Sequence, residues 1–272
     1  MSKTAIVTAG SRGIGRAIAK RLAEDGFAVV VNFTSSVHDA METVAEITES
    51  GGQAVAIQAD VTKEDDVKRL FENSLKEFGR IDVVVNNAGI MPLSPIARGD
   101  VETFDETIRI NLRSTFLVFA QAALQISKAG RIIAFSSSAL GKNSPSYGAY
   151  IASKAGVEGL VRVLANEIRG RQVTVNAVAL GPAANELSLE GKSEEEIARL
   201  GRLAVPDYSS ELNDIARVVC FLAGPEGGWI NGQVVPVTGG THDRFAAVGS
   251  SAGPGTSSKS SVAGGPLVHT PA

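Results

Sequence analysis

Apolar and polar positions follow two alternating periods along most of the chain. Short apolar runs, which are typical of buried strands, recur at residues 4–8, 28–33, 54–58, 81–85, 131–136, 173–178 and 234–237. Segments in which apolar residues repeat with a helical period lie between most of them, at residues 13–25, 37–50, 63–78, 101–127, 150–168 and 210–223. Parallel strands need long crossovers, so this alternation predicts an α/β fold. We expect one doubly wound parallel sheet of about seven strands, with helices on both faces.

The pattern changes twice toward the end of the chain. Between Pro182 and Pro206 the alternation stops, and Ser193 before three glutamates indicates the start of a short helix. That helix is interpreted either as a lid over a site or as a solvated acidic helix. From residue 244 onward Gly, Ser, Pro, Thr and Ala dominate, which is typical of a flexible tail. We therefore expect one domain over residues 1–243 and a tail over residues 244–272, with a tail that helps to close an oligomer as the alternative.

Composition excludes several classes of protein. With 272 residues and 44% hydrophobic content the chain can bury a substantial core, and a formal net charge of −3 argues against nucleic acid or an anionic membrane as a partner. No apolar run approaches the length of a membrane span, and Met1-Ser2-Lys3 leads into a strand rather than a signal peptide, so we expect a cytoplasmic protein. A single cysteine excludes an internal disulfide, and the three histidines lack ligand spacing, so no metal centre is expected.

A glycine-rich turn follows the first predicted strand. The segment Thr8-Ala9-Gly10-Ser11-Arg12-Gly13-Ile14-Gly15 lies between that strand and a predicted helix. In such a turn the glycines allow the backbone to approach a pyrophosphate, and the free amides of the helix hold its charge. A plain turn before a helix is the alternative interpretation.

The end of the second predicted strand bears on the choice of cofactor. Sites that prefer NAD usually carry an acidic residue there, and Phe33 stands in its place. Arg12 can pair with a 2′-phosphate, to which Ser35 and Ser36 can donate hydrogen bonds. This pattern favours NADP(H), with Arg12 as a simple surface charge as the alternative.

A tyrosine and a lysine lie four positions apart on one face of a predicted helix, as Tyr150 and Lys154. An ammonium beside a phenol favours the phenolate, so we expect the pKa of Tyr150 to fall from about 10 toward neutrality. Ser137 follows a predicted strand and can hold a substrate oxygen beside the phenol. Alternatively, the serines at positions 136–138 only satisfy backbone groups where the strand ends.

With these motifs the chain resembles the short-chain dehydrogenase/reductase family, in the branch of 3-oxoacyl-carrier-protein reductases and carbonyl reductases. The resemblance covers Lys3 to about Asp243 and depends on the glycine loop, Asn86-Asn87-Ala88-Gly89, Asn111 and the residues above. It implies a Rossmann-type fold and an NADP(H)-dependent oxidoreductase that transfers hydride between nicotinamide and a carbonyl or secondary alcohol. It also implies a small-molecule substrate and a homo-oligomer, either a dimer or a tetramer.

The resemblance further implies individual roles. Tyr150 would give its proton to the carbonyl oxygen, Ser137 would bind that oxygen, and Lys154 would bind the nicotinamide ribose. Asn111, in a helix, would help a proton relay through water, and Asp60 with Val61 would contact the adenine, although Asp60 could be a helix cap and Asn86–Gly89 a turn. The expected cofactor contacts are Gly10, Ser11, Arg12, Gly13, Ile14, Gly15, Asn32, Ser35, Ser36, Asp60, Val61, Asn87, Ala88, Gly89, Tyr150, Lys154, Gly181 and Pro182.

Some features depart from the family pattern or leave alternatives open. Ala9 replaces the usual first glycine, and we expect its methyl group to be harmless if φ stays negative. Leu180-Gly181-Pro182 replaces the usual Pro-Gly, and Asn185 replaces a threonine. A non-catalytic cofactor-binding sensor or scaffold is one alternative, and a 3-oxoacyl-carrier-protein reductase is another. The latter would need a basic patch at the site entrance, for which the candidates are Arg109, Arg113, Lys128 and Arg131.

Overall fold

The computed structural model describes residues 2–181 and 211–239. The expected lid helix with Ser193, the cofactor contact Pro182, the substituted position Asn185 and the tail over residues 244–272 lie outside these ranges.

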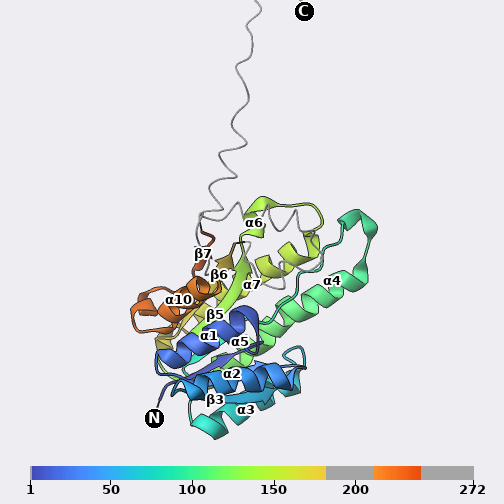
Figure 1. Cartoon of the computed structure of the whole chain (residues 1–272). Helices are drawn as coiled ribbons and strands as arrows, with labels where there is room; N and C mark the ends of the chain where they lie inside the picture. Colours follow the sequence, from blue (N-terminus) through green and yellow to red (C-terminus); the bar gives the residue numbers. More distant parts are fainter. Residues whose placement is uncertain (1, 182–210, 240–272) are drawn as a thin grey trace, which may run out of the picture.

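Within the described residues, seven strands form a single, entirely parallel sheet, and Figure 1 shows helices packed around it. Their bounds are Thr4–Val7 (β1), Ala28–Phe33 (β2), Gln53–Gln58 (β3), Val83–Asn86 (β4), Arg131–Ser137 (β5), Thr174–Leu180 (β6) and Val234–Val237 (β7). Their order is β3-β2-β1-β4-β5-β6-β7, and each neighbouring pair is parallel. The direction of winding reverses between β1 and β4, which opens a crevice at the carboxyl ends of these strands. The predicted doubly wound fold is therefore confirmed.

Helices cover both faces of the sheet because the strands carry apolar side chains on both sides. One buried cluster joins Ala5 and Val7 of β1 to α1, α2 and α10, and the other joins Ile6 to α3, α5 and α7. The helix bounds are Gly13–Glu24 (α1), Val37–Glu49 (α2), Glu64–Phe78 (α3), Val101–Thr107 (α4), Ser114–Gln125 (α5), Ala139–Lys142 (α6), Gly148–Glu167 (α7) and Glu211–Ala223 (α10), with short 3₁₀ turns at Ile96–Arg98 (η1), Arg169–Arg171 (η3) and Glu226–Trp229 (η4).

The single helix expected over residues 101–127 is interrupted. A π-helix, η2 (Ile108–Arg113), separates α4 from α5, and the amide of Ser114 donates to the carbonyl oxygen of Arg109, five residues earlier. The hydroxyl of Ser114 donates to the carbonyl oxygen of Ile110, and that of Thr115 donates to the carbonyl oxygen of Asn111 at 2.6 Å. These side chains satisfy carbonyl groups around the wider turn. The helical period of apolar residues gave no sign of the interruption.

Candidate active site

The predicted catalytic residues meet at the carboxyl ends of the central strands. Ser137 is the last residue of β5, Tyr150 and Lys154 lie in the first turns of α7, and Asn111 lies in η2. The segment after β4 begins at Asn87 and lies beside the glycine loop that follows β1. The fold therefore brings the four predicted catalytic residues to the crevice where the strand order reverses.

Lys154 is buried against the end of β5. Only 7% of the residue is exposed, and Nζ donates to the carbonyl oxygen of Phe135 at 3.0 Å. Because burial disfavours the charged form, it lowers the pKa of Lys154 to about 8. An ammonium has three donors, so Nζ can bind further groups besides Phe135. Nζ lies 5.9 Å from the centre of the Tyr150 ring.

The phenol of Tyr150 is also buried. Burial raises the pKa of Tyr150, the hydrogen bond with Ser137 lowers it, and the neighbouring Tyr147 raises it, so the net shift is upward. The expected lowering by Lys154 is therefore wrong for this arrangement, in which desolvation outweighs the other influences. A raised pKa keeps the phenol protonated at neutral pH, which suits a proton donor.

Asn111 is fully buried and braces the site from the π-helix. Its Oδ1 accepts from the amide of Ile90 at 2.8 Å, and its Nδ2 donates to the carbonyl oxygen of Ile90 at 2.9 Å. Nδ2 also donates to Oγ of Ser153 at 3.0 Å, and this hydroxyl donates to the carbonyl oxygen of Tyr150 at 2.7 Å. Sequence reasoning missed Ser153, which the spacing could have indicated, since it follows Tyr150 by one helical turn.

The glycine loop is packed too closely for side chains at two positions. A Cβ atom on Gly15 would lie 2.2 Å from the carbonyl oxygen of Ala9, and one on Gly10 would lie 2.9 Å from that of Val7. Gly13 has φ +52° and open space beside it. The loop therefore follows the tight path with an open outer side that a pyrophosphate needs at the N-terminus of α1.

The segment after β4 is tied directly to this loop. Oγ1 of Thr8 accepts from the amides of Asn87 at 2.9 Å and Ala88 at 3.1 Å, while Nδ2 of Asn87 donates to the carbonyl oxygen of Thr8 at 3.1 Å. A Cβ atom on Gly89 would lie 3.2 Å from Oδ1 of Asn111 and 3.5 Å from Nζ of Lys154. The segment thus connects the glycine loop to the predicted catalytic residues.

Ala9 adopts a left-handed conformation with φ +48°. The condition under which the methyl group was expected to be harmless, a negative φ, is therefore not met, and an alanine in this conformation costs about 1 kcal/mol. The neighbouring hydrogen bonds maintain the conformation, because the amide of Gly10 donates to the carbonyl oxygen of Asn32 at 2.8 Å.

The cofactor contacts predicted near the end of β2 differ from one another in burial and in hydrogen bonding. Asn32 is only 1% exposed, and its Nδ2 donates to the carbonyl oxygens of Ile57 at 3.2 Å and Ala59 at 3.0 Å, so it braces β2 against β3. Arg12 and Ser35 are exposed. Ser36 caps α2 by accepting from the amide of Asp39 at 3.3 Å, which leaves its hydroxyl hydrogen to donate.

The remaining predicted contacts lie at the ends of β3 and β6. Asp60 accepts from the amide of Thr62 at 3.0 Å in a turn before α3, whose cap residue is Lys63. Burial alone would raise the pKa of Asp60, but hydrogen bonds from Thr62 outweigh it and the net shift is downward. Val61 is buried, and the amide of Gly181 donates to the carbonyl oxygen of Val237 at 3.0 Å.

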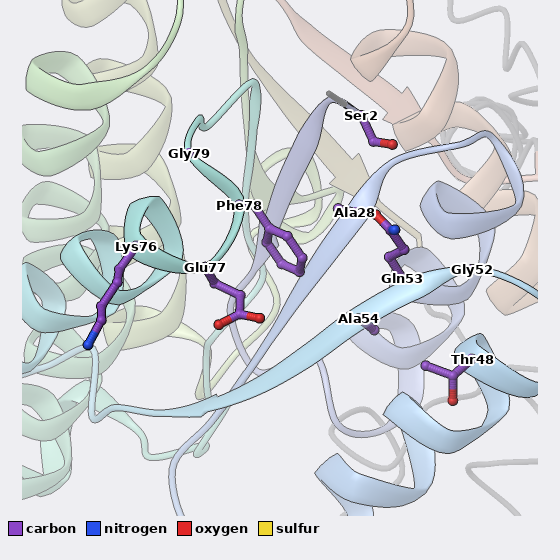
Figure 2. A pocket seen from close by; sticks show the side chains of 10 residues that line it. All are labelled: Ser2, Ala28, Thr48, Gly52, Gln53, Ala54, Lys76, Glu77, Phe78 and Gly79. Carbon is purple, nitrogen blue, oxygen red and sulfur yellow. The ribbon is translucent and has the colours of Figure 1, made fainter.

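Further features of the described residues bear on where other sites could lie. Within residues 2–181 and 211–239, no cluster of three or more metal-binding side chains occurs, and no helix is long and apolar enough to cross a membrane. Cys220 is buried, which raises the pKa of its thiol to about 12. An open hollow of about 910 Å³, lined by residues such as Gln53, Lys76 and Phe78, lies at the amino ends of β2 and β3 (Figure 2). The predicted catalytic residues lie at the other end of the sheet, where the strands have their carboxyl ends.

One of the four residues considered for a basic patch at the site entrance, Arg131, does not lie on the surface. Arg131 is only 8% exposed and donates to the carbonyl oxygens of Ala129 at 2.6 Å and Gly130 at 3.0 Å. Burial lowers the pKa of this guanidinium. Arg131 therefore contributes to the interior, not to the surface that faces a partner.

Comparison with known proteins agrees with this arrangement. A family model described as enoyl-(acyl carrier protein) reductase matches residues 8–242. An NADPH-dependent aldehyde reductase-like chloroplastic protein of Arabidopsis thaliana is 40% identical over 252 residues, covering 88% of this chain and 93% of the relative. A hydroxynaphthalene reductase-like protein of Metarhizium majus is 39% identical over 258 residues, covering 88% and 94%.

Superposition on a solved structure shows that the fold is shared as well. The short chain dehydrogenase of Burkholderia cenocepacia J2315, in complex with NADP, superposes with a TM-score of 0.80 at 35% identity, covering 88% of this chain and 97% of that one. The chain belongs to the short-chain dehydrogenase/reductase family. As a member of that family it is an oxidoreductase, and its parallel sheet is the Rossmann-type fold of its relatives.

Proposed function

We propose that the protein transfers hydride between NADP(H) and a carbonyl or secondary alcohol, with Tyr150 as general acid and base. One observation carries the proposal: a buried phenol, hydrogen-bonded to Ser137, lies next to the buried ammonium of Lys154. A non-catalytic binding protein would not need these three groups together, because burying them is unfavourable.

The residues of the chain divide the work as follows. When bound, the nicotinamide cofactor supplies or accepts the hydride. Tyr150 keeps its proton at neutral pH and donates it to the substrate oxygen, while the hydroxyl of Ser137 donates a second hydrogen bond to that oxygen. Once Tyr150 has lost its proton, the positive charge of Lys154 stabilises the phenolate that remains. The reverse order of steps applies to oxidation of an alcohol.

Substitution of Tyr150 by phenylalanine tests this mechanism. Because the Tyr150→Phe variant keeps the ring but lacks the proton donor, we expect NADPH-dependent turnover to fall at least about 100-fold. Binding of NADPH, measured by calorimetry, should change little. Tyr147→Phe is the matched control, because it removes a phenolic hydroxyl from the neighbouring ring. The centroids of the Tyr147 and Tyr150 rings lie 6.4 Å apart in an edge-on arrangement. Near-normal turnover of Tyr150→Phe would contradict the assigned role.

We propose NADP(H) rather than NAD(H) because the end of β2 lacks a carboxylate. Phe33 is buried there, so a phosphate would meet no negative charge from this residue, and the exposed Arg12 lies in the glycine loop. The Arabidopsis thaliana relative is named as NADPH-dependent, and the Burkholderia cenocepacia structure contains NADP. Arg12→Ala should lower the ratio of kcat/KM for NADPH to that for NADH. An unchanged ratio would exclude Arg12 as the phosphate partner.

We propose that the substrates are free small-molecule carbonyl compounds, in preference to acyl chains attached to a carrier protein. The buried position of Arg131 weakens the carrier-protein alternative, and the two curated relatives are named for aldehyde and hydroxynaphthalene reduction. An NADPH-oxidation screen with aliphatic aldehydes, aryl ketones and 3-oxoacyl thioesters would separate these classes. Preferred turnover of the thioesters would favour the carrier-protein alternative instead.

We also propose that two or four copies assemble through α5 and α7. Large apolar side chains are exposed on these helices, with Phe116 at 56%, Leu124 at 76% and Val163 at 55%. Leaving such side chains in water is unfavourable, and pairing of these faces would bury them.

A further inference from the structure

Two arginines of the π-helix reach across to the turn after β3. Nη1 of Arg109 donates to Oγ1 of Thr62 at 2.8 Å, and Nη1 of Arg113 donates to the carbonyl oxygen of Thr62 at 2.6 Å. The two arginines therefore hold both the side chain and the backbone of Thr62. Because Thr62 is buried, these hydrogen bonds are largely shielded from water. Hydrogen bonds from a charged donor are stronger than those between neutral groups.

Thr62 transmits this contact to Asp60. Its hydroxyl accepts from Arg109 and donates to Oδ1 of Asp60 at 2.8 Å, and its amide donates to the same oxygen at 3.0 Å. The amide of Asp60 in turn donates to Oδ2 of Asp66 on α3 at 2.9 Å. A hydroxyl can accept and donate at once, so Arg109, Thr62 and Asp60 form a directed chain. This chain determines where the Asp60 carboxylate and the Asp60–Thr62 turn lie.

The same π-helix carries Asn111, which points the other way. Residues two apart on a helix lie on nearly opposite sides, so Arg109 and Arg113 face the Asp60–Thr62 turn while Asn111 contacts Ile90 and Ser153. The π-helix η2 is therefore in hydrogen-bond contact with the turn after β3 and with the catalytic helix α7.

We propose that Arg109 and Arg113 are positioning residues for the adenine half of the cofactor, acting through Thr62 on the Asp60–Thr62 turn. This inference rests on the proposed function and on the adenine contact of Asp60 and Val61 that the family resemblance implies. Without the two guanidinium groups, Thr62 loses its partners on η2 and keeps only those within the turn, so the turn samples other conformations. The adenine half then binds more weakly, whereas Tyr150 and Lys154 stay in place.

Binding of an adenine-side fragment tests the inference without relying on turnover. Calorimetric titration with 2′,5′-ADP should show an affinity about tenfold lower for the double variant Arg109→Ala/Arg113→Ala than for the wild type. KM for NADPH should rise by a similar factor, while kcat at saturating NADPH should stay within about twofold. Arg113→Lys keeps a charged donor at position 113 and should therefore bind 2′,5′-ADP more tightly than Arg113→Ala. Arg217→Ala removes an exposed arginine that pairs with Asp214 on α10, and should bind like the wild type.

The possible outcomes are distinguishable. Wild-type affinity for 2′,5′-ADP in the double variant would overturn the inference, as would an Arg113→Lys variant that binds no better than Arg113→Ala. A loss confined to thermal stability, with affinity and KM unchanged, would show a merely structural role and would also overturn it. Failure of the wild-type protein to bind 2′,5′-ADP or NADPH would instead contradict the proposed function.

Discussion

Replacing the buried Lys154 by methionine should stabilise the fold while it destroys catalysis. Burial lowers the pKa of Lys154 from 10.5 to about 8, so the folded protein holds the ammonium at a cost in free energy. Methionine has a similar length and shape and carries no charge. The variant therefore removes the cost of the buried charge, together with the hydrogen bond to Phe135.

The expected magnitude follows from the size of the pKa shift. A lowering from 10.5 to about 8 corresponds to about 3 kcal/mol of destabilisation at pH 7, because each pKa unit is worth about 1.4 kcal/mol. Loss of the hydrogen bond to the carbonyl oxygen of Phe135 offsets about 1 kcal/mol of the gain. Lys154→Met should thus be about 2 kcal/mol more stable than the wild type at pH 7, which raises Tm by roughly 5 °C.

The pH dependence has a definite sign. Between pH 8 and pH 10.5 the unfolded chain holds the Lys154 proton more tightly than the folded protein, so wild-type stability rises with pH across this window. The methionine variant lacks this contribution, and its advantage should shrink from pH 8 upward and disappear near pH 10. Other groups titrate equally in both proteins, so the difference in their stability isolates the contribution of Lys154.

Thermal and urea unfolding at a series of pH values would measure the effect. Lys76→Met is the matched control, because Lys76 is exposed on α3 and its replacement should change stability by less than about 0.5 kcal/mol. A Lys154→Met protein that is less stable than the wild type at pH 7 would refute the reasoning. An advantage that stays constant from pH 7 to pH 10 would also refute it, since packing rather than charge would then be responsible.

Three further predictions concern the fold and its assembly. Ala9→Gly should raise the free energy of unfolding by about 0.5–1 kcal/mol, measured in urea, because a glycine adopts the φ of +48° without strain. Asp82→Ala should lower it by about 3 kcal/mol, since the buried carboxylate accepts from the amide of Thr4 at 2.9 Å and pairs with Arg80. Phe116→Asp should shift the protein toward monomers in light scattering at micromolar concentration, and a wild type that is already monomeric would reject the proposed assembly.

The sequence predicted the sheet well because the central strands are buried on both faces. Such strands are apolar throughout, and the run at residues 28–33 coincides with β2. The run at residues 234–237 also coincides with β7, although this strand lies at the edge of the sheet and is only partly buried. The other strands differ by one or two residues at their ends, where hydrogen bonding rather than hydrophobicity decides the boundary. Helices α1, α2, α3 and α10 were also predicted to within one residue at each end.

Local backbone geometry could not be predicted in the same way. The π-helix η2 adds a residue to one turn between two amphipathic helices, and no proline or glycine marks the change. Ala9 has a positive φ in a turn where its own amide donates to Oδ1 of Asn32 at 3.4 Å and the amide of Gly10 donates to the carbonyl oxygen of Asn32, whose buried position was not visible in the sequence. The sequence predicted Asn32 as a cofactor contact because a polar residue near the end of a strand can either bind a ligand or hold two strands together.

Burial also explains why the pairing of Tyr150 with Lys154 was predicted but the direction of the tyrosine shift was not. Their spacing on a helix is a property of the sequence, whereas desolvation depends on the strands and loops that surround them. Burial disfavours the charged form of each group, so it keeps the Tyr150 phenol protonated and makes the Lys154 ammonium easier to deprotonate. In the proposed reduction, the phenolate forms only when the proton moves to the substrate oxygen. At that moment the two buried charges are opposite in sign and offset one another, so the same desolvation that is unfavourable in the resting protein strengthens their attraction during catalysis.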